Sequence, residues 1–213
     1  MRIALLAIVL AACTSHDEHH IEASWTVDKY TPFLQGNSIG CPDGWDLARL
    51  VAIDPAHPDV RSVDTFPCDA FQGESSYLPA DSYIAWIELT TADGSKVLAQ
   101  SLEETVEVTS FNPILLTDIY VDAGYAEIEW ELADPARCPD DGSLGIRLDL
   151  APTSEAFVSE YVSCSAPRLV SPALLPGSYT ATFSNHDQVV SVIDHVTIEA
   201  PNRVTRLGTV TIP

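Results

Sequence analysis

One short segment has the spacing of a hydrolase nucleophile. Gly36-Asn37-Ser38-Ile39-Gly40 matches the G-x-S-x-G pattern, in which a serine on a tight strand-to-helix turn attacks a carbonyl carbon. The residues that follow, Cys41-Pro42-Asp43-Gly44, are typical of a turn and do not open a helix. We therefore predict no catalytic residue and no enzyme activity. The alternative is a hydrolase that uses Ser38 or an unrecognised pair of carboxylates.

Two further groups of residues have the chemistry of metal ligands. Residues 16–20 read His-Asp-Glu-His-His, and imidazoles with carboxylates suit zinc, copper or nickel. No flanking pattern fixes these side chains, so we interpret the segment as a polar spacer. The turns with Asp43 and Asp46, and with Asp140 and Asp141, lack the alternating order of a calcium loop. Because Asp is a common turn former, we predict no metal and no cofactor.

The first cysteine follows an apolar run. Ile3 to Leu10 is too short to cross a bilayer, which needs about 20 residues, but has the length of a secretory signal core. Leu10-Ala11-Ala12-Cys13 resembles the lipobox of bacterial lipoprotein precursors. The resemblance implies a signal peptide over residues 1–12, lipidation of Cys13 and a tether over residues 13–22. Thr14 in place of Asp favours the outer membrane in that family, so we expect a lipoprotein anchored there.

The composition excludes one class of partner. The chain has 31 acidic and 10 basic residues, a formal net charge of −21. Loss of the signal peptide removes Arg2, which leaves nine basic residues and a net charge of −22. Such a surface repels the phosphates of nucleic acids and favours cations and basic partners. We predict no nucleic-acid binding.

An internal repeat organises the rest of the chain. "CPDGWDLARLVAIDP" (41–55) aligns with "CPDDGSLGIRLDLAP" (138–152), and the offset stays at 96 or 97 through the second cysteines and the Leu-Pro turns. Four cysteines in an exported chain allow three pairings, and each copy should close its own bridge. We therefore predict disulfides Cys41–Cys68 and Cys138–Cys164, in domains covering residues 23–121 and 122–213.

Strict alternation of apolar and polar residues predicts the fold. Segments 126–132, 144–150, 179–183 and 195–200 alternate, and turn signals recur between such segments. The prediction is all-β: two tandem antiparallel β-sandwiches, immunoglobulin-like or prealbumin-like. Leu175-Pro176-Gly177-Ser178-Tyr179 before an alternating strand resembles prealbumin-like modules such as carboxypeptidase regulatory domains. That resemblance implies a non-catalytic role.

The tryptophans suggest a binding surface on the first domain. Trp25 and Trp130 occupy equivalent inward positions and should lie in the two cores. The alternation in "YIAWIEL" (83–89) directs Ile84 and Trp86 outward, towards a ligand or the second domain.

Additions that only the first copy carries strengthen this prediction. Trp45 and an insert over residues 30–40, which contains Phe33, have no counterpart in the second copy. We predict that Phe33, Trp45, Ile84 and Trp86 bind an envelope protein or a glycan, because function is commonly grafted onto a shared framework. The alternative function is that of an envelope hydrolase.

Overall fold

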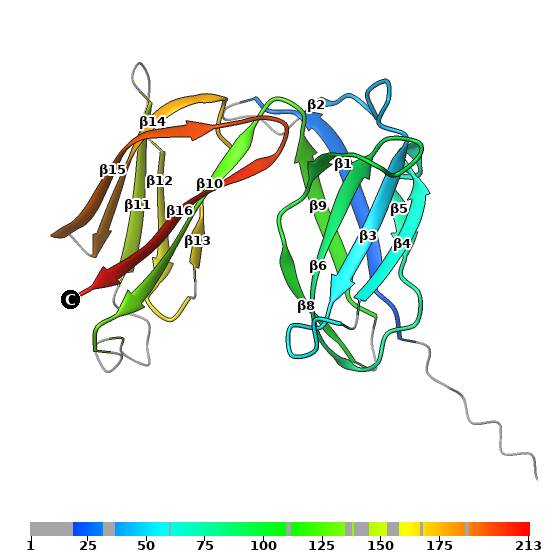
Figure 1. Ribbon diagram of the computed structural model, residues 1–213, viewed down its shortest axis with the longest axis horizontal. Coiled ribbons are helices and arrows are strands. Elements are labelled where there is room, and N and C mark those ends of the chain that lie inside the picture. Colours follow the sequence, from blue (N-terminus) through cyan, green and yellow to red (C-terminus); the bar gives the residue numbers. More distant parts are fainter. Residues whose placement is uncertain are drawn as a thin grey trace, which may run out of the picture.

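The structure is a computed structural model with two β-sandwiches side by side, joined at one end (Figure 1). It describes residues 19–31, 37–59, 61–109, 112–134, 138, 145–152, 158–166, 168–185 and 188–213. None of these residues forms a helix that is long and apolar enough to span a membrane. Cys13, Phe33, Asp140 and Asp141, and with them the predicted signal peptide and lipobox, lie outside the described residues.

The first domain contains nine strands and a short 3-10 helix within the described residues. Its β1 sheet consists of β2 (Asn37–Ser38), β1 (Glu22–Lys29), β5 (Gln72–Glu74) and β9 (Ile114–Tyr120). Its β3 sheet consists of β4 (Arg61–Pro67), β3 (Leu47–Ile53), β6 (Asp81–Thr90), β7 (Val97–Gln100) and β8 (Glu104–Val108). The 3-10 helix η1 (Cys68–Ala70) joins β4 to β5.

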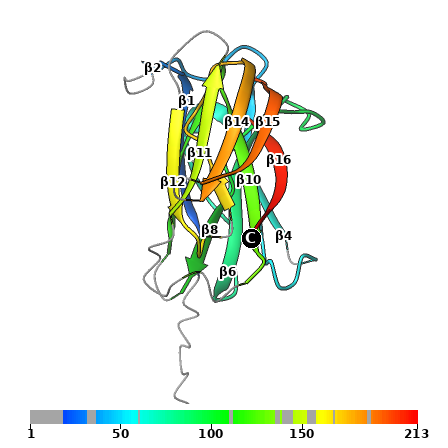
Figure 2. The same cartoon turned by 90° about the vertical axis from the view of Figure 1, so that its left-hand side faces the viewer.

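The second domain repeats this arrangement. Its β10 sheet consists of β13 (Arg168–Val170), β10 (Gly124–Leu132) and β16 (Arg203–Ile212). Its β11 sheet consists of β12 (Val158–Ser163), β11 (Gly145–Pro152), β14 (Gly177–Asn185) and β15 (Gln188–Ile198), and it faces the viewer in Figure 2. The prediction of two tandem β-sandwiches is confirmed.

The pairing is antiparallel except at one place in each domain. The first strand pairs parallel with the last, β1 with β9 and β10 with β16, so the prediction of wholly antiparallel sheets is wrong at this pair. A parallel pair needs a long crossover, and the intervening strands of the same domain provide it. In immunoglobulin constant domains the first two strands share a sheet, whereas β11, the second strand of the second domain, lies in the sheet opposite β10. The prealbumin-like resemblance stays a prediction.

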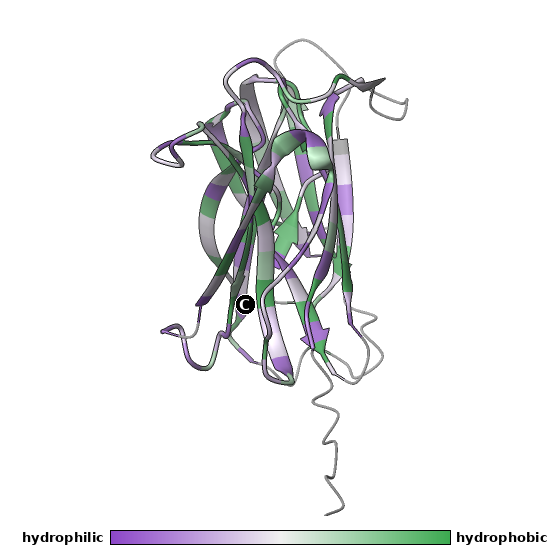
Figure 3. Ribbon diagram, turned by 90° about the vertical axis from the view of Figure 1, so that its right-hand side faces the viewer, coloured by the Kyte–Doolittle hydropathy of each residue, from purple (hydrophilic) through white to green (hydrophobic). Residues whose placement is uncertain are grey.

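Each domain has its own core, disulfide and tryptophan. The bridges are Cys41–Cys68 and Cys138–Cys164, as predicted. Trp25 and Trp130 are buried, and each indole Nε1 donates a hydrogen bond to the carbonyl of the second cysteine, at 3.0 Å to Cys68 and 3.3 Å to Cys164. Figure 3 shows hydrophobic and hydrophilic residues alternating along the strands. This alternation places one face of each strand in a core.

The repeat alignment needs one correction inside the second long strand. Leu50 of β3 lies opposite Ile87, and Leu148 of β11 lies opposite Phe183, while the adjoining strands keep an offset of 96. The offset within β3 and β11 is therefore 98, not 97. The ungapped alignment missed this shift because both strands are rich in apolar residues, so a one-residue slip still matched Leu47 with Leu144.

The first strand of the second domain depends on one glycine. β9 ends at Tyr120 and β10 begins at Gly124, whose N–H and C=O pair with Leu174. A Cβ atom on Gly124 would lie 2.2 Å from the carbonyl oxygen of Glu199 and 2.9 Å from that of Arg203. Backbone oxygens cannot move aside as a flexible side chain can, so this position requires glycine.

Gly124→Ala should therefore lower the free energy of unfolding of the second domain by about 2 kcal/mol or more. The matched control is Gly145→Ala, because a Cβ atom on Gly145 in β11 meets no atom within 4 Å. Denaturant unfolding followed by tryptophan fluorescence measures both. Equal stability of the two variants would contradict the close approach at Gly124.

Candidate functional site

Trp86 points away from the core but is not exposed. Its side of the strand was predicted correctly, since the alternating residues Tyr83, Ala85 and Ile87 face the core. However, the side chain is only 9% exposed, and its Nε1 donates a 3.1 Å hydrogen bond to Oε1 of Glu88. Val51, its register partner on β3, is fully buried on the same outer face. The prediction of an exposed aromatic anchor is wrong, because the indole is buried and bonded to Glu88.

Of the other predicted binding residues, Ile84 shares the outer face of β6 with Trp86, whereas Trp45 does not. Trp45 is partly buried and packs against the core of the first domain. Ile84 is half-buried on the outer face of the β3 sheet. Phe33 lies outside the described residues, so its predicted role stays untested.

Ser38 does not stand on a nucleophile elbow. It is exposed in the two-residue strand β2, which pairs antiparallel with β1. A strand-to-helix turn is needed to hold such a serine, and η1 is the one helix in the described part of the chain. No described histidine or carboxylate forms a hydrogen bond to it.

Part of the predicted tether belongs to the first domain. Ile21 is fully buried in the core, and β1 already begins at Glu22. The backbone N–H of His20 donates to Oδ1 of Asn112 at 3.1 Å. The tether therefore ends before residue 22, because the apolar Ile21 side chain is part of the β1 alternation.

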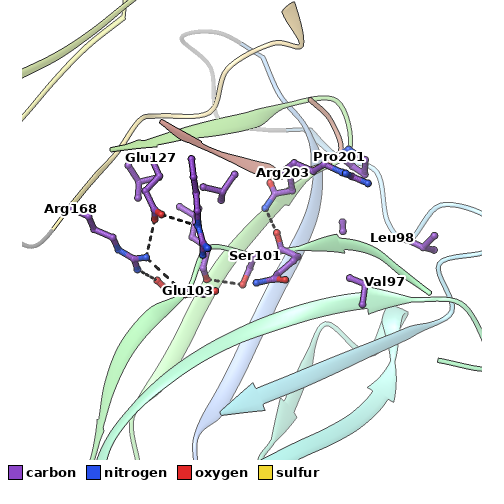
Figure 4. A pocket seen from close by; sticks show the side chains of 15 residues that line it. Val97, Leu98, Ser101, Glu103, Glu127, Arg168, Pro201 and Arg203 are labelled. Carbon is purple, nitrogen blue, oxygen red and sulfur yellow. Dashed lines mark hydrogen bonds and ion pairs between the residues drawn. The ribbon is translucent and has the colours of Figure 1, made fainter. Parts of the chain in front are cut away.

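A polar cleft lies between the two domains. A cleft of about 480 Å³ separates β7 and the segment that follows it, in the first domain, from β10, β13 and the β15–β16 turn in the second (Figure 4). Val97, Leu102 and Glu103 line it on one side, and Arg168 and Arg206 on the other. A volume of this size at a domain boundary is common for binding sites.

Glu127 is the central charge of this cleft. Its carboxylate is 6% exposed, and its two oxygens lie 2.9 Å from Nη1 of Arg168 and 3.4 Å from Nε of Arg206. Arg168 also donates to the carbonyl oxygen of Glu103 at 3.2 Å, which ties the second domain to the first. A buried carboxylate needs such partners, because an unpaired buried charge costs several kcal/mol.

Asn202 forms a second tie at the same joint. It is 1% exposed, with φ of 45°, a left-handed conformation that Asn adopts more readily than most residues. Its Nδ2 donates to the carbonyl oxygen of Gln100 at 2.7 Å, and its Oδ1 accepts from the backbone N–H of Tyr120 at 2.8 Å. One side chain thus fixes β7 and the end of β9 to the second domain.

Apolar packing completes the joint. A small buried cluster combines Ala123, Tyr125 and Ala173 with Leu102 and other residues of the first domain. Burial raises the pKa of the Tyr125 hydroxyl well above its usual value, so this group stays neutral at physiological pH. The joint therefore contains paired charges, satisfied amides and neutral rings. It suits a fixed spacing of the two domains better than proton transfer.

Sequence reasoning did not identify the residues of this joint. Glu127 stood in an alternating "AEIEWEL" segment, where every glutamate reads as solvent-exposed. Glu127 is distinguished by its ion pairs with Arg168 on β13 and Arg206 on β16, which are 41 and 79 residues away in the sequence. Only the strand order reveals it.

Comparisons with known proteins find likenesses of structure and none of sequence. No family model and no curated protein sequence matches the chain. A leucine-rich repeat protein from Bacteroides thetaiotaomicron is similar over 91% of this chain, with 10% identity and a TM-score of 0.36; the chain spans 26% of its length. The minor pilin GBS52 of Streptococcus agalactiae is 13% identical over 92% of this chain and 97% of its own, with a TM-score of 0.31. The fimbrial anchor protein Mfa2 of Porphyromonas gingivalis is 10% identical over 82% of both chains, with a TM-score of 0.31. We base no functional argument on these values.

Trp86→Ala should lower the free energy of unfolding of the first domain by about 3 kcal/mol, since it removes a buried indole. Thermal and denaturant unfolding measure the effect. Val63→Ala is the control, because Val63 is an exposed side chain on the outer face of the same sheet, and it should cost less than about 1 kcal/mol. Unchanged stability with loss of binding to an envelope partner would instead restore the predicted anchor role.

Asn202→Ala should loosen the joint, because it leaves the Tyr120 N–H and the Gln100 carbonyl without their partner, at a cost of about 1–3 kcal/mol. Hydrogen exchange of the Tyr120 amide should become faster. Asn202→Asp keeps the acceptor oxygen and loses the donor, so it should protect Tyr120 while still releasing Gln100. Equal exchange rates in all three proteins would show that Asn202 does not hold the joint.

Proposed function

We propose that this chain is a non-catalytic, lipid-anchored protein of the bacterial cell envelope that acts as a binding or scaffold module for a protein or glycan. The observation that carries the proposal is the lipobox Leu10-Ala11-Ala12-Cys13 directly before a disulfide-closed pair of domains. Several acyl chains anchor a protein stably, whereas one does not. Disulfides in both domains suit an oxidising compartment outside the cytoplasm.

The joint supports a scaffold role in particular. Asn202 and Arg168 tie the two domains at separate points, so the pair presents its surfaces at a fixed spacing. In the described residues, the buried polar side chains Glu127, Asp149 and Asn202 are engaged in hydrogen bonds or ion pairs within the protein. Such hydrogen bonds and ion pairs stabilise a framework and leave no activated nucleophile among these groups.

The anchor can be tested on the precursor. Cys13→Ala, or globomycin treatment of the wild type, should block lipoprotein processing, and the cysteine variant should lose stable membrane retention. Membrane fractionation and the mass of the N-terminal peptide measure both effects. Cys41→Ala is a suitable control, because loss of a domain disulfide should alter stability without removing the lipid. Unaltered processing and retention of Cys13→Ala would refute the anchor.

A further inference from the structure

We propose that copies of this chain associate head to tail, the outer face of the β1 sheet of one copy receiving the β15 edge of the next. The inference rests on the proposed scaffold function and gives it a partner, a second copy of the chain. It follows from the internal duplication, because the joint between the two domains uses one such face and one such edge, and leaves the equivalent pair unused.

The internal joint defines the template. The segment that follows β7, Gln100 to Glu103, docks on the outer face of the β10 sheet. Gln100 accepts from Asn202, Leu102 packs in the shared apolar cluster, and Glu103 accepts from Arg168. The edge of the other domain thus covers the β10 sheet around Tyr125, Glu127 and Ala173, while Arg206 and Thr209 beside it stay exposed.

The equivalent face of the first domain is open. By strand register, Glu22 corresponds to Glu127, while Ile114 and Leu116 on β9 take the places of Arg206 and Thr209 on β16. Ile114 is 62% exposed and Leu116 67% exposed. Side chains of this size and exposure on adjacent outward positions of a terminal strand are characteristic of interaction surfaces.

Another position on the same face supports the correspondence. Leu78 and Leu174 occupy equivalent positions: the Leu78 N–H binds the carbonyl oxygen of His19, and the Leu174 N–H binds that of Gly124. Tyr77 therefore corresponds to Ala173, which is buried in the joint. Tyr77 is an exposed large side chain. An aromatic ring thus adds to the apolar area on the open face of the first domain.

The edge that would dock there is also apolar and exposed. Gln100 lies opposite Glu88, and Val189 lies opposite the equivalent Ser184, so residues 189–192 correspond to the docking segment after β7. Val189 is 55% exposed and Val192 54% exposed. In the internal joint the corresponding segment is covered. At the position of the docking segment, the second domain therefore carries an exposed edge with two valines in place of Gln100 and Glu103.

The two unused surfaces lie on different domains, so they cannot meet within one chain while the internal joint holds. Contact between them makes a heterologous interface, which propagates as a ring or an open filament. Glu22, Glu74 and Asp118 surround the open face, and Asp194 follows Val192. Like charges oppose this contact, so salt should strengthen it by screening the repulsion. A basic partner protein would show the reverse dependence.

The test uses the full lipidated chain in neutral detergent, studied by sedimentation velocity over a range of protein concentrations. The average mass should rise with protein concentration. Association should be tighter in about 0.5 M NaCl than in about 0.05 M NaCl, because the higher salt shortens the screening length. Leu116→Asp or Val192→Asp alone should weaken association by at least about tenfold. Mixing the two variants should restore pairs, since the position-116 variant retains an intact edge and the position-192 variant retains an intact face.

The control is Tyr161→Asp, which replaces an exposed aromatic on the outer face of the β11 sheet and should leave association unchanged. All three variants replace exposed side chains, so unchanged thermal unfolding shows that they fold. A single mass at every concentration, or no restoration on mixing, would overturn the inference. So would weaker association at high salt.

A photocrosslinking residue at position 116 in intact cells tests the partner directly. The expected adduct joins position 116 of one copy to the region of Val192 in another. Adducts only with a different protein, or only with lipid, would overturn self-association. Membrane retention that depends on Cys13 would then still stand, so failure of this inference is distinguishable from failure of the proposed function.

Discussion

A buried carboxylate, that of Glu127, fixes how the two sandwiches are placed. It lies under the edge of the first domain, where an unpaired charge would be strongly unfavourable. Arg168 and Arg206, from the strands on either side of β10, neutralise it. Because Arg168 also binds the first domain through Glu103, the pairing that permits burial also sets the docking position. Asn202 adds a second tie, to Tyr120 and Gln100 of the first domain, while Gly124 allows β10 to approach Glu199 and Arg203 within the second domain.

The duplication separates what folding requires from what the two domains use differently. Both domains retain the disulfide, the indole bond to the cysteine carbonyl, and a tyrosine whose hydroxyl bonds four residues back, in Tyr83 to Pro79 and Tyr179 to Leu175. The outward residues have diverged. In the second domain they form ion pairs under a neighbour, whereas in the first they remain acidic and apolar at the surface.

Much of the fold could be predicted from the sequence, because the alternation of Ile128, Trp130 and Leu132 and the cysteine spacing are local signals. The parallel pairing of first and last strands could not, since it depends on contacts across a whole domain. Trp86 shows a further limit. Alternation predicts the face of the strand on which a side chain lies, but not whether that side chain is exposed or buried.

The candidate site was even harder to predict from the sequence. Arg168 and Arg206 are distant from Glu127 in the sequence, and nothing local distinguishes these charges from ordinary surface residues. Sequence reasoning looked for function in additions that one copy has and the other lacks. The structure directs attention instead to equivalent positions with different surroundings, where the same sheet face is covered in one domain and open in the other.

The strong negative charge and the exposed apolar residues act over different distances. Repulsion between acidic surfaces extends over a Debye length, about 8 Å at physiological ionic strength, whereas apolar contact requires direct touching. Free acidic chains therefore tend to stay apart. The proposed lipid anchor would confine them to one surface and raise their effective concentration, in the way that a linker does for tethered domains. With that confinement, the proposed contact through Ile114 and Leu116 would need only a low intrinsic affinity, and release from the membrane would reverse it.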